Sequence, residues 1–208
     1  MTKIKLCGLK HAQDIDTANL LKPDYVGFVF AQNSRRAVLD GEAADLRARL
    51  DPSIRTVGVF VKEPLDHIEQ LLLNGIIDVV QLHGGEDMAY IHQLRARTDK
   101  PIWKAFSMNA REDAFFAQQS MADLVLLDSS DGGSGTLFSW GLLDEISRPY
   151  FLAGGLTPEN VKDAVKMLDP YGVDVSSGIE TNGRKDPEKM KAFVSAVRRA
   201  NGVGMEGE

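Results

Sequence analysis

The sequence predicts a single (β/α)8 (TIM) barrel with eight parallel strands. Three observations lead to this prediction: eight short runs rich in apolar and β-branched residues, helical spacing between them, and chemically unusual residues where the runs end. Most runs are apolar without alternation, as in parallel strands that are covered on both faces. Right-handed crossovers between eight such strands close most simply into a barrel, and an open doubly wound sheet is the alternative.

The eight runs are spread along nearly the whole chain. They are KIKLC (3–7), YVGFVF (25–30), TVGVFV (56–61), DVVQL (78–82), PIWKAF (101–106), LVLLD (124–128), YFLAG (150–154) and VDVS (173–176). A glycine or polar loop follows each run, and a stretch with helical spacing comes next. We therefore expect strand and helix to alternate to the end of the chain.

Two of the intervening helices have recognisable start signals. Thr157 before Pro158, and Asp186 before Pro187, each place a capping residue ahead of a proline at the first helical position. Apolar stripes predict two buried helix faces, formed by Leu65, Ile68, Leu71 and Leu72 and by Met190, Phe193, Val194 and Val197. We predict one barrel domain over residues 1–201 and a frayed tail over 202–208.

Composition restricts the possible functions. The chain has 208 residues, a net charge of −6, and basic residues scattered among acidic ones, which disfavours nucleic acid and anionic membranes as partners. Neither a signal peptide nor a bilayer-spanning stretch is found, so we expect a cytoplasmic protein. Cys7 is the one cysteine, which excludes an internal disulfide and a cysteine-based zinc cluster.

Reactive or charged residues lie where several runs end. Cys7 ends the first run, Arg35 and Arg36 follow the second, His83 follows the fourth, and Asp128 ends the sixth. Each alone has a structural explanation: a small buried thiol, a solvated arginine pair, a structural histidine, or a helix cap. In a (β/α)8 barrel, however, the loops after the strands converge over one mouth, where the active site lies. Their gathering on one predicted face favours catalysis.

Glycine-bearing turns follow the seventh and eighth runs. Gly154, Gly155, Ser177 and Gly178 lack the bulk that would keep an anion away from backbone N–H groups. A phosphate site in such barrels is commonly built at these two positions, and a helix starting at Pro158 would add its positive end. Each turn alone is a weak signal. Together they predict a small phosphorylated ligand.

The ordered motifs resemble the phosphoribosylanthranilate isomerase family of tryptophan biosynthesis. The resemblance is carried by KLCGLK (5–10), GFVF with SRR (27–36), VGVFV (57–61), VQLHG (80–84), LLD with GGSG and FSW (126–140), LAGGL with PENV (152–161), and VDVSSGIE with GRKD (173–186). It covers nearly the whole chain. The combination of Cys-Gly at the first strand, QLHG at the fourth and SSGIE at the eighth is highly specific.

The resemblance implies an Amadori rearrangement that converts N-(5-phosphoribosyl)anthranilate into 1-(2-carboxyphenylamino)-1-deoxyribulose 5-phosphate. By the same resemblance, Cys7 matches the general base, Asp128 the general acid, and Arg36 the residue that faces the anthranilate carboxylate. His83 and the glycine turns complete the expected substrate site. The reaction needs no metal or other cofactor. We expect a small-molecule substrate and a monomer in preference to a homodimer.

Three positions depart from the family pattern. Lys10, Arg35 and Ser139 stand where a small hydroxyl residue, a proline and an aspartate are usual. Lys10 beside Cys7 would favour the thiolate, as would the start of the first helix. Two other functions fit a barrel with a phosphate site: an epimerase or synthase acting on a related phosphosugar, and a phospholigand sensor or scaffold without turnover. The acid, base and anion positions favour the isomerase.

Overall fold

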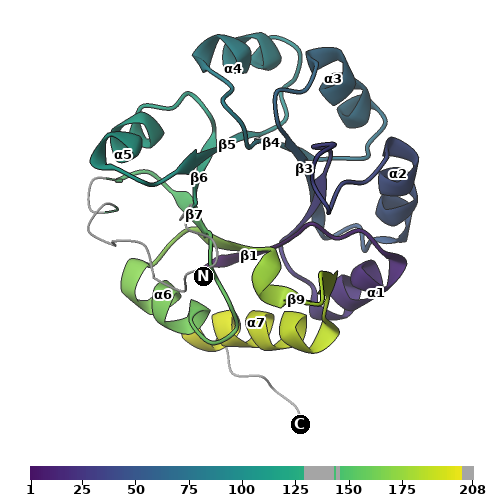
Figure 1. The fold of residues 1–208 in the computed structure, drawn as a ribbon, viewed down its shortest axis with the longest axis vertical. Coiled ribbons are helices and arrows are strands. Elements are labelled where there is room, and N and C mark those ends of the chain that lie inside the picture. The colour runs from purple at the N-terminus through teal and green to yellow at the C-terminus, as the bar shows by residue number, and fades with distance from the viewer. Residues whose placement is uncertain (129–142, 144–145, 203–208) are drawn as a thin grey trace.

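The computed structural model describes residues 1–128, 143 and 146–202 and has a closed barrel of eight parallel strands (Figure 1). The strands are β1 (Lys3–Cys7), β2 (Tyr25–Val29), β3 (Arg55–Phe60), β4 (Val79–Leu82), β5 (Ile102–Ser107), β6 (Leu124–Asp128), β7 (Tyr150–Ala153) and β8 (Gly172–Val175). Each strand pairs with the next one, and β8 returns to β1. The predicted barrel is confirmed, and the open sheet is wrong.

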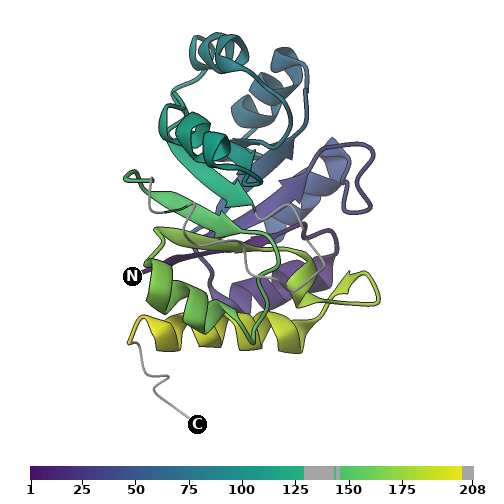
Figure 2. The same cartoon turned by 60° about the vertical axis from the view of Figure 1, so that its left-hand side comes forward.

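Helices form a ring outside the strands (Figures 1 and 2). They are α1 (Ala12–Leu21), α2 (Asp40–Arg49), α3 (Leu65–Leu73), α4 (Met88–Arg95), α5 (Arg111–Gln118), α6 (Val161–Leu168) and α7 (Pro187–Ala200). The connection from β6 to β7 falls largely on residues 129–142 and 144–145, outside the described residues. None of the described helices is long and apolar enough to span a lipid bilayer.

The segment between β8 and α7 contains three short elements. The 3-10 helix η2 (Ser177–Ile179) leads into an antiparallel hairpin of β9 (Glu180–Thr181) and β10 (Arg184–Lys185). In Figure 1 this segment lies beside α1 and α7. It brings two charged side chains, Glu180 and Lys185, toward the mouth of the barrel.

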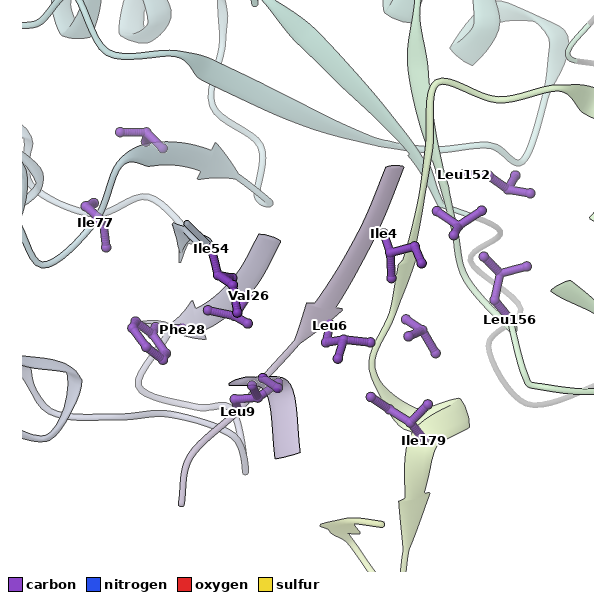
Figure 3. Packing of buried hydrophobic residues seen from close by; sticks show 14 of the residues in the cluster. Ile4, Leu6, Leu9, Val26, Phe28, Ile54, Ile77, Leu152, Leu156 and Ile179 are labelled. Carbon is purple, nitrogen blue, oxygen red and sulfur yellow. The ribbon is translucent and has the colours of Figure 1, made fainter. Parts of the chain in front are cut away.

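The hydrophobic core has two parts. The larger part fills the space between strands and helices, and Figure 3 shows some of its members, such as Ile4, Leu6 and Val26. A second cluster lies inside the barrel, where the Trp103 ring is 5.0 Å from those of both Tyr25 and Phe151. Since alternate residues of a strand face opposite sides, Lys5 and Cys7 on β1 face the interior while Ile4 and Leu6 face the helices.

One of the two predicted helix starts is confirmed. The helix α7 begins at Pro187, and the Asp186 carboxylate caps it by accepting hydrogen bonds from the backbone N–H groups of Glu188 and Lys189. Both apolar stripes are also confirmed, because the α7 stripe is buried and the α3 stripe packs on the core.

The other helix start is wrong by several residues. The helix α6 begins at Val161, whereas Pro158 lies in the preceding turn. Asn160 explains the difference, because its side chain accepts from the Thr157 N–H at 2.8 Å and donates to the Gly155 carbonyl at 2.9 Å. Residues 158–160 form a turn ahead of the helix, in which Thr157 accepts from the Glu159 N–H at 3.3 Å and, through its carbonyl, from the Val161 N–H at 3.1 Å. The predicted tail falls, apart from Gly202, outside the described residues.

Candidate active site

A cavity of about 530 Å³ opens where the eight strands end. All eight strands contribute to its lining, from Cys7 on β1 to Asp174 on β8. Seven of the eight predicted site residues line it: Cys7, Arg36, His83, Asp128, Gly154, Gly155 and Ser177. Within the described chain, the remaining one, Gly178, does not line the cavity. The structure therefore brings together the side chains that the strand ends predicted.

Cys7 lies at the C-terminal end of β1 with its side chain buried. The facing position on β2 is Gly27, and a Cβ built there would lie 2.8 Å from Cys7 Sγ and 3.2 Å from Lys5 Nζ. The thiol and the ammonium are thus side by side, in space that only a glycine leaves open. Lys5 in turn binds Asp174 of β8, with 2.8 Å between Nζ and Oδ1.

The environment of Cys7 differs from the prediction. Burial raises the pKa of the thiol, Lys5 lowers it and Asp174 raises it, and the net direction is upward. The cations that act on the thiol include Lys5, Lys185 and Arg36, so the role expected for Lys10 is taken by Lys5. The expectation of a depressed thiol pKa is therefore wrong, because desolvation outweighs the neighbouring cations.

Arg36 lies at the rim of the cavity and is held by Glu180. Its Nε donates to Oε1 at 2.6 Å and its Nη2 to Oε2 at 3.0 Å. Arg35 binds the same carboxylate at 2.8 Å but is 62 % exposed, against 22 % for Arg36. The two arginines are therefore not merely a solvated pair, since both bind a carboxylate that is buried.

Lys185 is the third cation on Glu180. Its Nζ lies 2.8 Å from Glu180 Oε1 and donates to the Ser176 carbonyl at 2.8 Å. Burial lowers the pKa of Lys185 and Glu180 counteracts this, while Glu180 itself has a pKa of about 2, because its hydrogen bonds to Arg36 and Lys185 outweigh its burial. Three cations around one carboxylate leave two positive charges beside the cavity.

Asp128 and His83 lie together on another side of the cavity. The Nε2 atom of His83 is 3.5 Å from Oδ2 of Asp128, and its Nδ1 atom is 3.1 Å from the Nε2 amide nitrogen of Gln81. The Gln81 amide nitrogen is a donor, so Nδ1 lies where it can accept from it, and Nε2 is the ring atom that faces Asp128. The Gln81 Oε1 atom is a buried acceptor with no partner among the described residues.

The two glycine turns are in contact with each other. Gly154 and Gly155 have φ of +83° and +62°, in the left-handed region that favours glycine. No described protein group accepts a hydrogen bond from the N–H of either. A Cβ at Gly178 would lie 1.9 Å from the Leu156 carbonyl oxygen, so Gly178 lets the η2 turn pack directly on the turn after β7. In the structure, Gly178 allows the turn after β8 to approach the turn after β7 closely.

The GGSG and FSW motifs, with Ser139, lie outside the described residues. Among the side chains that the structure describes, no group of three or more His, Cys, Asp or Glu residues could hold a metal ion.

The sequence matches the family described as N-(5'phosphoribosyl)anthranilate (PRA) isomerase over residues 4–196. The chain belongs to the phosphoribosylanthranilate isomerase family. This confirms the predicted family and favours the isomerase over the epimerase, synthase and sensor alternatives.

Individual relatives of the isomerase family agree over nearly the full length. The N-(5'-phosphoribosyl)anthranilate isomerase of Endomicrobium trichonymphae is 46 % identical over 202 residues, covering 95 % of this chain and 99 % of the relative. A crystal structure of a phosphoribosylanthranilate isomerase in complex with reduced 1-(o-carboxyphenylamino)-1-deoxyribulose 5-phosphate has a TM-score of 0.84 at 32 % identity, covering 97 % and 100 % of the two chains.

A third relative, also an isomerase, is described as a dimeric enzyme. Crystallised monomers of the dimeric enzyme of Thermotoga maritima have a TM-score of 0.83 at 33 % identity, with 97 % of this chain and 100 % of that chain covered.

Several residues of this isomerase-family site were missed by the sequence reasoning. They are Lys5, Gln81, Asp174, Glu180 and Lys185. Lys5 and Asp174 had a detectable signal, because each is a charged residue in the middle of a strand and has apolar residues directly before and after it. Glu180 and Lys185 fall within the SSGIE and GRKD motifs that follow the last strand, but the sequence reasoning assigned no role to either.

Proposed function

We propose that the chain isomerises N-(5-phosphoribosyl)anthranilate to 1-(2-carboxyphenylamino)-1-deoxyribulose 5-phosphate in tryptophan biosynthesis. One observation carries the proposal: a thiol and a carboxyl group, Cys7 and Asp128, border one cavity together with Arg36 and the two glycine turns. The substrate has a phosphate, a ribose ring and an anthranilate carboxylate. The cavity has groups suited to each of the three.

The first chemical step is opening of the ribose ring. Asp128, in its protonated form, donates a proton to the ring oxygen while the C1′–O bond breaks and the anilino nitrogen forms an iminium with C1′. The nearby Nε2–H of His83 then faces the resulting carboxylate and can stabilise its negative charge. We assign Asp128 the role of general acid and His83 a supporting role in substrate binding.

The second step is removal of the proton at C2′, which the iminium makes acidic. Cys7, as the thiolate, accepts this proton, and the electron pair of the C–H bond neutralises the iminium to give an enolamine. Tautomerisation of the enolamine gives the ketone. Protons move within the substrate and to and from side chains, so the proposed reaction needs no external oxidant, reductant or metal.

The phosphate is proposed to bind at the glycine turns. The N–H groups of Gly154 and Gly155 are available to an anion, and Ser177 borders the cavity beside them. Gly178 supports this site by allowing the two turns to touch. The two uncompensated positive charges around Glu180 attract an anionic substrate to the same mouth.

Arg36 is proposed to bind the anthranilate carboxylate. Glu180 occupies Nε and Nη2 on one side of the guanidinium, and no described residue accepts from Nη1. The terminal Nη1 and Nη2 atoms form a second edge that suits a carboxylate. Arg36 can therefore hold the substrate while it remains bound to Glu180.

The protein is proposed to act in the cytoplasm as a monomer. An acidic chain with no block of basic residues supports a small-molecule enzyme. Light scattering on purified protein tests the monomer, and a mass of twice the chain at micromolar concentration would contradict it.

The activity is tested by the fluorescence of the anthranilate group. Purified protein is added to freshly made phosphoribosylanthranilate, and the fluorescence is expected to fall with a rate proportional to enzyme concentration. Substrate without enzyme controls for spontaneous hydrolysis. Fluorescence that decays at the same rate with and without the protein would overturn the proposed function.

A further inference from the structure

Two charged side chains inside the barrel have no part in the acid–base scheme. Lys5 of β1 and Asp174 of β8 form an ion pair of 2.8 Å, and their side chains are 0 % and 9 % exposed. They occupy paired positions on neighbouring strands, so both face the barrel interior. In the described part of the chain, Lys5 is among the large side chains that are fully buried.

Stability alone does not account for this pair. Removing two charges from water carries a large desolvation cost, and apolar side chains of similar volume are often as stable or more so. The neighbouring interior residues Tyr25, Trp103 and Phe151 are aromatic, so the barrel can be filled without charge at this level. We therefore look for a neighbouring group that is charged in only part of the reaction cycle and that the buried lysine would stabilise while it is charged.

Cys7 is that partner. It lies two residues after Lys5 on the same face of β1, and the Cβ position of Gly27 is within 3.2 Å of both Cys7 Sγ and Lys5 Nζ. Asp174 also borders the cavity from β8. The ammonium thus contacts the Asp174 carboxylate at 2.8 Å and lies next to the sulfur.

The other charged groups that act on Cys7 are already engaged. Lys185 and Arg36 both interact electrostatically with the thiol, and both bind Glu180. Asp174 opposes ionisation of the thiol, and Lys5 is the cation that favours it most. Asp128 and His83 border the same cavity from the ends of β6 and β4.

We propose that Lys5 is a positioning residue that stabilises the thiolate form of Cys7, and that Asp174 holds the Lys5 ammonium against the sulfur. The inference rests on the proposed function, because it takes Cys7 as the base. During turnover the thiolate accepts the C2′ proton, whereas Lys5 keeps its own protons throughout. Burial lowers the pKa of Lys5, but Asp174 and Cys7 raise it, and the net direction is upward, so Lys5 stays charged.

The test is the pH dependence of alkylation of Cys7 by iodoacetamide. Only the thiolate reacts, and Cys7 is the single cysteine of the chain, so the modification seen by mass spectrometry belongs to one atom. The double variant Lys5→Met, Asp174→Asn removes both charges while keeping similar volumes. We expect its alkylation midpoint to rise by about one pH unit and its kcat/KM at neutral pH to fall about tenfold.

A matched control lies on the same strand. Lys3 forms a similar ion pair, 2.8 Å from Asp24, two residues before Lys5 and away from the thiol. Lys3→Met should leave the alkylation midpoint of Cys7 where it is in the wild type. An equal shift in Lys3→Met and in the double variant would overturn the inference, because the effect would then follow loss of any ion pair on β1.

A second variant keeps the test decisive if the double variant does not fold. Lys5→Gln keeps a hydrogen-bond donor for Asp174 and removes the cation that favours ionisation of the thiol. Its alkylation midpoint is expected to rise. A purely structural pair predicts midpoints unmoved in both variants, and that result would overturn the inference.

Alkylation of Cys7 needs no turnover. The proposed isomerase function and the proposed role of Lys5 can therefore be contradicted independently of each other. An enzyme with isomerase activity but unmoved midpoints would contradict the role of Lys5 alone. A protein with shifted midpoints and no isomerase activity would contradict the proposed function and leave the coupling of Lys5 to Cys7 in place.

Discussion

Glu180 binds Arg36 along the side of its guanidinium, through Nε at 2.6 Å and Nη2 at 3.0 Å. A guanidinium has two edges that can each take a carboxylate in a bidentate manner. The protein carboxylate uses one edge, and the edge that contains Nη1 remains for the ligand. Glu180 therefore fixes the direction in which Arg36 presents its charge.

Arg36→Ala is expected to raise KM at least tenfold with a smaller effect on kcat, since it removes a contact to a part of the substrate that does not react. Arg35→Ala is the matched control. Arg35 binds the same carboxylate but is more exposed, so its loss should change KM less than about threefold. Steady-state kinetics on both variants checks this, and equal effects would contradict the assignment of Arg36.

Glu180→Gln is expected to lower the melting temperature at neutral pH and much less in strong acid. The folded-state pKa of Glu180 is about 2, below its ordinary value, because hydrogen bonds to Arg36 and Lys185 outweigh its burial. The stability that its charge contributes is present above the ordinary pKa of about 4.3 and is lost as the pH falls toward 2. Melting curves of the two proteins should converge over this range. A constant difference would show that the charge is not responsible.

Cys7→Ser and Asp128→Asn are each expected to reduce kcat by about 10²- to 10⁴-fold. A serine hydroxyl does not ionise near neutral pH, and an asparagine amide has no acidic proton to donate. Both replacements are close in size, so melting temperatures should change little. Turnover and thermal stability are measured side by side, and Cys7→Ser with near wild-type turnover would mean that the thiol only fills space.

The rate at which iodoacetamide alkylates Cys7 in the wild-type protein is expected to rise with pH through neutrality and into the alkaline range. The thiolate is the form of Cys7 that iodoacetamide alkylates, and burial raises the thiol pKa above its ordinary value despite Lys5. Below that pKa, each unit of pH increases the thiolate fraction about tenfold. The pH dependence of the alkylation rate, followed by mass spectrometry, checks this. A plateau that begins well below neutral pH would contradict a raised thiol pKa.

Gly178→Ala is expected to destabilise the fold by about 1–3 kcal/mol, because its methyl group would meet the Leu156 carbonyl oxygen. The displaced turns should also bind phosphate less well. Gly41→Ala, in α2, is the matched control, since no atom lies within 4 Å of the added carbon. Melting temperatures with and without inorganic phosphate test both statements. Equal stability of the two variants would mean that the turns can separate without cost.

The barrel and most of the residues that line the cavity could be predicted from the sequence, and the reason is topological. Parallel strands end on one side, so residues that end separate runs, such as Cys7 and Asp128, meet without any information on loop structure. The start of α6 could not be found in this way. The sequence pattern placed this start at Pro158, whereas α6 begins at Val161. The hydrogen bond between Asn160 and Thr157 lies between these two points and is not visible in the pattern.

Electrostatic neighbours were the harder part of the site. Lys10 is close to Cys7 in sequence, yet Lys5 is close to it in space, because residues two apart on a strand share a face. Asp174 and Lys185 reach the thiol only through closure of β8 on β1. Sequence distance carries no information on such contacts, and the raised pKa of the thiol follows from burial that a linear reading does not reveal.

The closure of β8 on β1 also determines when the thiol acquires its surroundings. Lys5 and Asp174 are separated by 169 positions, as are Ser176 and Cys7, whose carbonyl accepts from the Ser176 hydroxyl. Contacts between such distant segments form late, because a long loop must close first. During synthesis β1 leaves the ribosome early. Its partner strand β8 is made only after almost the whole barrel. The chemical environment of Cys7 is thus among the last features of the molecule to be assembled.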